Sequence, residues 1–332
     1  MGFNEMHKIA IVNSSSFGKY FPSHIERLKT LGKVEHFTFP ADIAGKDLAE
    51  ALAEFDLIIA SVIPFFTKEF FDHHPSCRLI SRHGIGYNNV DIHSASEHKC
   101  MVTKVEGWVE QDAVAENAIA LLMNLTRLQS PAQKAVLEGR WVDRARFLGY
   151  QVRHKTVGVI GYGNIGSRVG EIMKNGFECR VLAYDPNLDL SQNPSCEPSK
   201  LETIYNEADI LFLNASLSPA NRHMIDTQTI AKMKDGVIIV NTARGELVDD
   251  QAILKAVESG KVFAYGADVV EGEPIDATHP LLTHPNILIT PHISAYTYEC
   301  LEGMGNSCVE DCESVVRHEI PKRLINTELR FL

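Results

Sequence analysis

The chain has 332 residues, which at roughly 150 residues per domain predicts about two domains. With 45% hydrophobic and 23% charged residues, its composition excludes intrinsic disorder for the bulk of the chain. A formal net charge of −11 argues against a general binder of nucleic-acid backbones, since such a protein needs a basic face.

Short apolar runs alternate with helical patterns in the first hundred residues. The expected strands are Lys8–Val12, Val34–Phe37, Leu57–Ser61, Arg78–Ser81 and Met101–Lys104. Helical patterns separate them, as in His24–Leu31 and Lys46–Phe55. This alternation is typical of a parallel sheet covered by helices.

The segment Glu110–Leu128 has a helical pattern with apolar residues around most of its circumference. A helix without a clear polar face must be buried on several sides. Two interpretations stay open, a core helix between domains and a helix at a subunit interface.

A second set of apolar runs follows this helix. The expected strands are Val157–Gly161, Val181–Asp185, Ile210–Asn214, Val237–Asn241, Ala264–Val270 and Ile287–Pro291. Several are apolar on both faces, as central parallel strands are. Pro186–Ser199 is expected as a surface loop, and Tyr296–His318 as a final helix. We therefore predict an α/β fold with two doubly wound parallel-sheet domains.

Three glycines lie between the first strand of the second set and a helical pattern. Gly161, Gly163 and Gly166 form GxGxxG in the strand–turn–helix context that dinucleotide binding requires. Their roles would be a tight turn, close approach to a pyrophosphate, and close packing of helix on strand. Asn164 and Ile165 complete the predicted cofactor loop, although an ordinary tight turn is the alternative.

Asp185 lies nineteen residues after Gly166, at the end of the next expected strand. A carboxylate there accepts hydrogen bonds from the adenosine ribose and repels a 2′-phosphate. Residues 181–199 contain no Lys or Arg, so we expect NAD rather than NADP. A solvated loop carboxylate is the alternative.

Arg244, Glu273 and His292 each follow one of the last three strands, at the edge where α/β sheets bind ligands. Taken singly, each could be a surface or structural residue. Together they fit hydride chemistry on a 2-oxo acid. A guanidinium holds the carboxylate, a histidine gives the proton, and a carboxylate orients that histidine.

The motifs GYGNIG, NTARGELVD, GADVVEGEP, TPHISAYT and RHGIGYNNVD resemble those of the D-isomer-specific 2-hydroxyacid dehydrogenases over nearly the whole chain. The resemblance implies that Arg244 and His292 act as described. It also implies Glu273 as the partner of His292, because Glu273 directly precedes Pro274 as the family glutamate commonly does. Glu271 is the competing candidate.

The resemblance further implies a substrate site and more cofactor contacts. The substrate site comprises His83, Gly84, Ile85, Gly86, Arg244 and His292, with backbone amides of the glycine segment facing the substrate carboxylate. The added cofactor residues are Thr242, Ala243 and Asp268, the last contacting the nicotinamide carboxamide. His83 stands where an apolar residue is frequent, which bears on the identity of the substrate.

The resemblance implies a discontinuous substrate domain of the flavodoxin-like type, formed by residues 1–105 and a C-terminal segment, 299–332. A Rossmann domain for NAD, residues 106–298, would be inserted between them. It also suggests a homodimer built largely on Glu110–Leu128.

The resulting expectation is an NAD-dependent D-2-hydroxyacid dehydrogenase that transfers hydride reversibly between NADH and a 2-oxo acid. The alternatives within the family are a glyoxylate or hydroxypyruvate reductase and a phosphoglycerate dehydrogenase. An NAD-sensing protein similar to the related corepressors is the alternative of another class. Phe65 and Phe66 either line a pocket for an apolar substrate side chain or start a helix and pack in its core.

The remaining features predict a cytoplasmic protein without a metal site. The N-terminal residues lack a signal peptide's long apolar core, and no stretch approaches the ~18 apolar residues that cross a membrane. The seven cysteines are scattered without a CxxC pair, so free thiols are expected.

Overall fold

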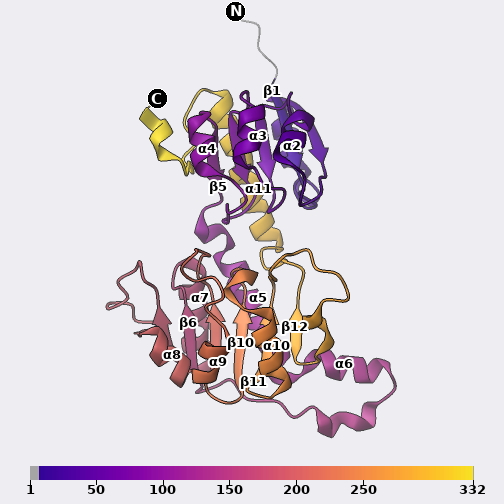
Figure 1. Cartoon of the computed structure of the whole chain (residues 1–332), viewed down its shortest axis with the longest axis vertical. Helices are drawn as coiled ribbons and strands as arrows, with labels where there is room; N and C mark the ends of the chain where they lie inside the picture. The colour runs from indigo at the N-terminus through magenta and orange to yellow at the C-terminus, as the bar shows by residue number, and fades with distance from the viewer. Residues whose placement is uncertain (1–6, 332) are drawn as a thin grey trace, which may run out of the picture. The chain divides into compact units, whose positions relative to one another are not determined.

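The computed structural model describes residues 7–331 and divides into two compact units. Unit 1 comprises Met1–Glu110 and Tyr296–Leu332, and unit 2 comprises Gln111–Ala295. Each unit contains one parallel sheet flanked by helices (Figure 1). The α/β fold with two parallel sheets predicted from the sequence is confirmed.

The sheet of unit 1 has the strand order β2-β1-β3-β4-β5. Its strands are β1 (His7–Val12), β2 (Gly32–Phe37), β3 (Leu57–Ala60), β4 (Leu79–Arg82) and β5 (Met101–Lys104). In β1, Ile9 lies opposite Val34 of β2 on one side and Leu57 of β3 on the other. The chain winds outward from β1 in both directions, so both faces need helical cover.

Helices cover both faces of this sheet. They are α1 (Pro22–Lys29), α2 (Gly45–Ala51), α3 (Lys68–His73), α4 (Ile92–Glu97) and α11 (Tyr298–Val316), with a 3₁₀ turn, η4 (Thr327–Phe331), near the C-terminus. Helices α2, α3 and α4 pack on one face, and α1 and α11 pack on the other. The C-terminal helix thus belongs to unit 1, where it contacts α1 and β4.

The two phenylalanines considered as pocket residues have different environments. Phe66 is fully buried in the core under α2, α3 and α4, and its backbone pairs with that of Asn89 and Asp91. A role for Phe66 in the substrate pocket is therefore wrong, because its side chain fills the core. Phe65 is 51% exposed, and α3 begins only at Lys68.

The sheet of unit 2 has the strand order β12-β11-β10-β9-β6-β7-β8. Its strands are β6 (Thr156–Ile160), β7 (Arg180–Tyr184), β8 (Glu197–Pro198), β9 (Ile210–Leu213), β10 (Val237–Asn241), β11 (Val262–Ala267) and β12 (Ile287–Ile289). Two expectations need correction. The segment expected as a loop ends in the edge strand β8, which pairs with β7. Strand β11 ends three residues before the predicted Val270, so Asp268 lies beyond the strand.

The helical elements of unit 2 pack on both faces of its sheet. They are α5 (Gly107–Arg127), α6 (Gln129–Leu137), α7 (Asn164–Phe177), α8 (Leu201–Glu207), α9 (Thr227–Lys232) and α10 (Asp250–Glu258), with the 3₁₀ turns η1 (Trp141–Arg146), η2 (Gly245–Leu247) and η3 (Pro280–Thr283). Helix α5 begins in unit 1 and continues into unit 2.

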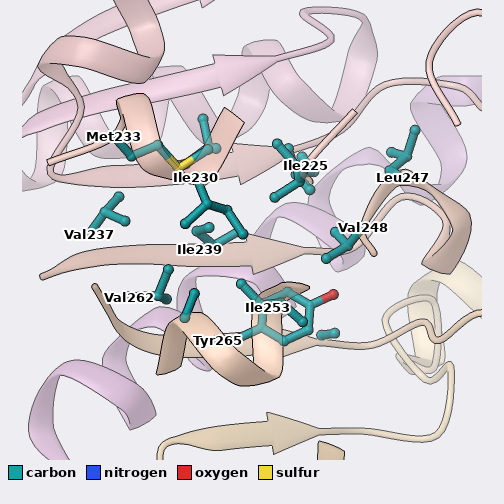
Figure 2. Close-up of a cluster of buried hydrophobic side chains, with 14 of the residues drawn as sticks. Ile225, Ile230, Met233, Val237, Ile239, Leu247, Val248, Ile253, Val262 and Tyr265 are labelled. Carbon is teal, nitrogen blue, oxygen red and sulfur yellow. The ribbon is translucent and has the colours of Figure 1, made fainter. Parts of the chain in front are cut away.

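The apolar faces of the unit 2 sheet explain why its strands lack alternation. On one face, Ile239 and Tyr265 from neighbouring strands pack with Ile225 and Ile253 (Figure 2). On the other face, α5 and α7 cover β6, β7, β9 and β10. The predicted burial of the long apolar helix is confirmed on this side, since α5 contributes Ala118 and other buried residues to the core.

Within residues 7–331, no helix combines the length and the apolar character needed to cross a membrane.

Candidate active site

The glycine loop of unit 2 joins β6 to α7. Gly161 has a φ of +86°, and a Cβ there would lie 2.5 Å from the backbone nitrogen of Ala215. A Cβ on Gly166 would lie 1.9 Å from the carbonyl oxygen of Gly161, so the helix packs closely on the turn. A Cβ on Gly163 would meet no atom within 4 Å. The second glycine therefore leaves open space at the point where a phosphate approaches the backbone.

The surroundings of this loop fit a dinucleotide. No side chain caps the N-terminus of α7, whose first turn offers amide donors and the positive end of the helix dipole to an anion. Asn214 follows β9 beside Gly161, and its buried Oδ1 has no partner among the described residues. Its Nδ2 donates to Thr242 Oγ1 at 3.3 Å. A bound cofactor can satisfy such an orphaned acceptor.

Asp185 is held rigidly beside the glycine loop. It directly follows β7, and its Oδ2 accepts a hydrogen bond of 2.9 Å from the backbone N–H of Tyr162. Its Oδ1 accepts a bond of 2.9 Å from the N–H of Asn187. The carboxylate is thus fixed at the end of the second strand, with lone pairs remaining for a ribose hydroxyl.

Arg244 lies at the start of η2, in a turn that buried Asn241 organises. Asn241 Nδ2 donates to the carbonyl of Arg244 at 2.9 Å, and Asn241 Oδ1 accepts from the N–H of Ala243 at 3.0 Å. The guanidinium Nη1 donates to the carbonyl of Ala243 at 2.6 Å. No other hydrogen bond of this guanidinium is made within residues 7–331, so it can still bind a carboxylate bidentately.

Glu273 contacts His292 directly. Glu273 Oε1 pairs with His292 Nδ1, and Glu273 Oε2 accepts a bond of 3.1 Å from the N–H of Val270. Burial alone would raise the pKa of Glu273, but the bond and charge of His292, with weaker help from Val270 and Arg244, bring it below its ordinary value. Glu273 is therefore ionised at neutral pH, and Nε2 is the histidine nitrogen left for a substrate.

The backbone of His292 is anchored through Asp268, which is 1% exposed. The His292 N–H donates to the carbonyl of Asp268 at 2.9 Å. The Asp268 carboxylate accepts from Thr290, Ile293 and Ser294. Asp268 thus fixes the loop that carries the histidine, a role the sequence did not suggest. Its predicted contact with the nicotinamide stays a prediction.

Glu271, the competing carboxylate, has other partners. Its Oε1 pairs with Arg222 Nη2, and its Oε2 lies 2.6 Å from His223 Nε2. Burial acts to raise the pKa of Glu271, but the bonds and charges of His223 and Arg222 lower it below its ordinary value. The structure thus places Glu273, and not Glu271, against His292.

The predicted substrate loop of unit 1 directly follows β4. The Ile85 N–H donates to Glu110 Oε1 at 2.9 Å, and Arg82 Nε donates to the carbonyl of Gly86 at 2.9 Å. His83 is buried, and its Nε2 has no partner within residues 7–331. Burial, with the charge of Arg82, lowers the pKa of His83 to about 3. The role of this loop toward a substrate stays a prediction.

Comparison with known proteins identifies the family. Residues 119–294 match the model described as D-isomer specific 2-hydroxyacid dehydrogenase, NAD binding domain. A hydroxypyruvate reductase from Thermotoga maritima is 36% identical to this chain over 80% of the chain and 86% of that protein. The chain belongs to the D-isomer specific 2-hydroxyacid dehydrogenase family.

Other relatives agree with this assignment. A glyoxylate reductase from Korarchaeum cryptofilum is 32% identical, with 86% of each chain covered. The solved structure of a D-lactate dehydrogenase from Aquifex aeolicus, complexed with NAD and lactic acid, superposes with a TM-score of 0.84 at 26% identity. That match covers 96% of this chain and 99% of the other. The predicted family is confirmed, and with it an oxidoreductase that acts on CH–OH groups with NAD(P).

The structure of this dehydrogenase brings together, in unit 2, the predicted cofactor loop and the three predicted catalytic side chains at the carboxyl ends of its strands. Sequence reasoning missed Asn241 and His223. The only signal for Asn241 is its place as the polar last residue of an apolar strand. His223 has no signal beyond an adjacent arginine in a loop. The described residues contain no group of three His, Cys, Asp or Glu side chains arranged to hold a metal ion.

Proposed function

We propose that this dehydrogenase reduces a small 2-oxo acid of the glyoxylate or hydroxypyruvate class to the corresponding 2-hydroxy acid with NADH. The observation that carries the proposal is the pair of His292 and Glu273, which lies with Arg244 at the carboxyl ends of β10, β11 and β12. These strands continue in the same sheet to β6 and its glycine loop. A proton donor, a carboxylate binder and a dinucleotide loop thus occupy one edge.

The chemistry follows from these side chains. When bound, the reduced nicotinamide supplies the hydride that adds to C2 of the oxo acid. Arg244 binds the substrate carboxylate through two parallel hydrogen bonds and so orients the carbonyl. The imidazolium of His292 gives its Nε2 proton to the carbonyl oxygen, which becomes the hydroxyl of the product. Glu273 holds the imidazole at Nδ1 and stabilises its charged form. In the reverse direction, neutral His292 accepts the hydroxyl proton.

The substrate class comes from the relatives. The sequence favoured a general 2-hydroxyacid dehydrogenase, with small-acid reductases as an alternative, and the named relatives at 36% and 32% identity support that alternative. The burial of Phe66 agrees, because it removes one of two side chains considered for an apolar pocket.

The preference for NADH over NADPH rests on Asp185. Its carboxylate is fixed by two backbone amides at the end of β7, where a 2′-phosphate would meet negative charge. Residues 185–196, which join β7 to β8, contain no Lys or Arg that could compensate.

A homodimer is the proposed assembly. Its expected interface on Glu110–Leu128 stays a prediction, and the segment that follows this helix adds exposed apolar side chains to it. The segment 129–150, with α6 and η1, extends from the sheet of unit 2 (Figure 1). Four of its large apolar side chains, Leu137, Trp141, Val142 and Leu148, are each more than two-thirds exposed. Apolar groups gathered in this way are typical of interaction surfaces. Sedimentation of the wild type and of Trp141→Asp tests this, since a monomeric wild type would contradict the dimer.

The central experiment compares 2-oxo acids and both cofactors. We expect kcat/KM with NADH to be highest for hydroxypyruvate or glyoxylate, lower for a branched-chain 2-oxo acid and for phosphohydroxypyruvate, and much lower with NADPH. Preference for the branched or phosphorylated acid would overturn the substrate class, and equal use of NADPH would overturn the cofactor. An NAD-sensing protein would instead bind NADH without turnover on any acid.

A further inference from the structure

Two histidine–glutamate pairs flank Gly272. Glu273 pairs with His292, while Glu271 lies against His223. Both histidines have left-handed backbones, with φ of 55° for His292 and 50° for His223. Residues other than glycine keep such a conformation only where their surroundings fix it. The backbones of both histidines are therefore fixed by their surroundings.

The backbone of His223 is bonded to the turn that carries Arg244. Its N–H donates to the carbonyl of Glu246 at 2.7 Å, and two residues later the N–H of Ile225 donates to the carbonyl of Leu247 at 3.0 Å. The segment of His223 thus runs beside η2, directly after Arg244.

The turn of Arg244 also touches the loop of the two glutamates. A Cβ on Gly245 would lie 2.1 Å from the backbone nitrogen of Glu271, so the two backbones are in direct contact there. His223 is bonded to both sides of this contact, through its N–H to Glu246 and through Nε2 to Glu271. No other described histidine makes both of these bonds.

We propose that His223 is a positioning residue that, together with Arg222, fixes the loop of Glu273 against the turn of Arg244. The inference rests on the proposed function, since it concerns the same site. His223 acts through Glu271, which is two residues from Glu273 along the chain. Fixing Glu271 fixes Glu273, and Glu273 in turn orients His292.

The charged groups around His223 come from three segments. Arg222 is its neighbour in sequence, Glu271 faces it from the loop after β11, and Asp250 interacts with it from α10. Burial raises the pKa of Asp250 to about 6, although His279, 3.6 Å away, opposes this. Asp250 is unchanged in every variant below, so its titration is common to all of them.

Removing the donor should loosen the site without unfolding it. In His223→Leu we expect kcat for reduction to fall about tenfold to a hundredfold, as small misplacements of catalytic groups do. The pH at which reduction declines should move down by about half a unit to one unit, because Glu273 then supports the imidazolium less well. The Kd for NADH should not change. His223→Gln, which keeps a donor on a side chain of similar reach, should recover most of kcat and the original pH profile.

A matched control separates positioning from general structure. His154 is also left-handed, with φ of 65°, and lies 3.8 Å from Glu178 at the opposite end of β6. His154→Leu should leave kcat and the pH profile unchanged. The role of His223 is merely structural if His223→Leu lowers only the melting temperature. It is also merely structural if the variant loses activity while its pH profile stays unchanged, and either result overturns the inference.

A readout independent of activity separates this inference from the proposed function. The imidazole titration of His292 can be followed by NMR of histidine-labelled protein and assigned with His292→Gln. A titration midpoint that moves down in His223→Leu and returns in His223→Gln supports the positioning role even if no 2-oxo acid is reduced, in which case the proposed function fails alone. An unmoved midpoint in an enzyme that reduces hydroxypyruvate overturns the inference alone.

Discussion

The carboxyl edges of the two sheets place histidine in opposite environments. In unit 2, His292 follows β12 and pairs with the carboxylate of Glu273. In unit 1, His83 follows β4 without such a partner, and its ring packs edge-on against Phe17 at 5.3 Å. His24 contacts the same phenylalanine at 5.7 Å, and its Nε2 is also buried without a partner in the described part of the chain.

The difference shows how environment decides what an imidazole can do. Burial lowers the pKa of His83 to about 3 and also lowers that of His24, so both stay neutral over the physiological range. His292 instead has its Nδ1 paired with the carboxylate of Glu273. The two parallel sheets thus hold the same residue type in an apolar environment and beside a carboxylate.

Arg244→Lys should reduce kcat/KM by about tenfold to a hundredfold, since losing one charge-assisted hydrogen bond costs about 1.5–3 kcal/mol. The charge is kept, but an ammonium cannot reproduce the two parallel bonds of a guanidinium. Steady-state kinetics with hydroxypyruvate measure the effect. The control is Arg153→Lys, an exposed ion pair with Glu178 in the same unit. A loss below about tenfold would refute the role of Arg244.

His83→Met should make the folded protein less sensitive to acid than the wild type, because protonation of the buried His83 opposes folding. With a pKa of about 3 folded and 6.5 unfolded, His83 favours the native state fully above pH 6.5, and this contribution declines as the pH falls toward 3. At pH 5, which is 1.5 units below 6.5, the decline is about 2 kcal/mol at 1.36 kcal/mol per unit.

The measurement for His83 is thermal unfolding of wild type and variant from pH 8 to pH 5. As the pH falls from 8 to 5, the free energy of unfolding of His83→Met should rise by about 2 kcal/mol relative to that of the wild type. His93→Gln is the control, because His93 is solvent-exposed on α4 of the same unit. A difference between wild type and His83→Met that does not change with pH would show that His83 does not stay neutral in the folded state.

Glu273→Gln should move both pH profiles of the enzyme to lower pH together. The pKa of Glu273 lies below its ordinary value, so the wild type carries a carboxylate beside His292 at neutral pH. Reduction needs the imidazolium and declines as the pH rises, while oxidation needs neutral His292 and climbs over the same interval. Without the carboxylate the imidazolium is less stable, and we expect both limbs to move down by about one unit.

The pH dependence of kcat/KM in both directions checks this prediction. Glu271→Gln is the informative comparison, because Glu271 touches His223 and not His292. It should move the limbs less than Glu273→Gln does. Limbs that stay in place in Glu273→Gln, or that move in opposite directions, would show that Glu273 does not support His292.

The sequence predicted what depends on neighbours along the chain. Val237–Asn241 is a strand with the predicted bounds, since its apolar run is bounded by polar residues and a glycine. The glycine loop was predictable because three glycines at fixed spacing serve one turn. The end of β11 could not be predicted in this way, because the partners that bind Asp268 lie more than twenty residues away along the chain. His223 was missed for the same reason, since its partner Glu271 is 48 residues distant.

The smallest expected effect concerns how far the two units are independent in stability. Asp91 caps α4 in unit 1 by accepting a bond of 3.0 Å from the N–H of Ser94. Asp249 caps α10 in unit 2 through the N–H groups of Gln251 and Ala252. Replacing either aspartate by alanine should lower the free energy of unfolding by about 1 kcal/mol, as the loss of an N-cap does.

Hydrogen exchange can then show which strands lose protection. Asp91→Ala should speed exchange in β5 and leave β6 protected, and Asp249→Ala should do the reverse, because each sheet closes its own core. Equal loss of protection in both sheets from either change would mean that the units unfold together. Destabilisation of unit 1 by protonation of His83 would then also unfold the catalytic residues of unit 2.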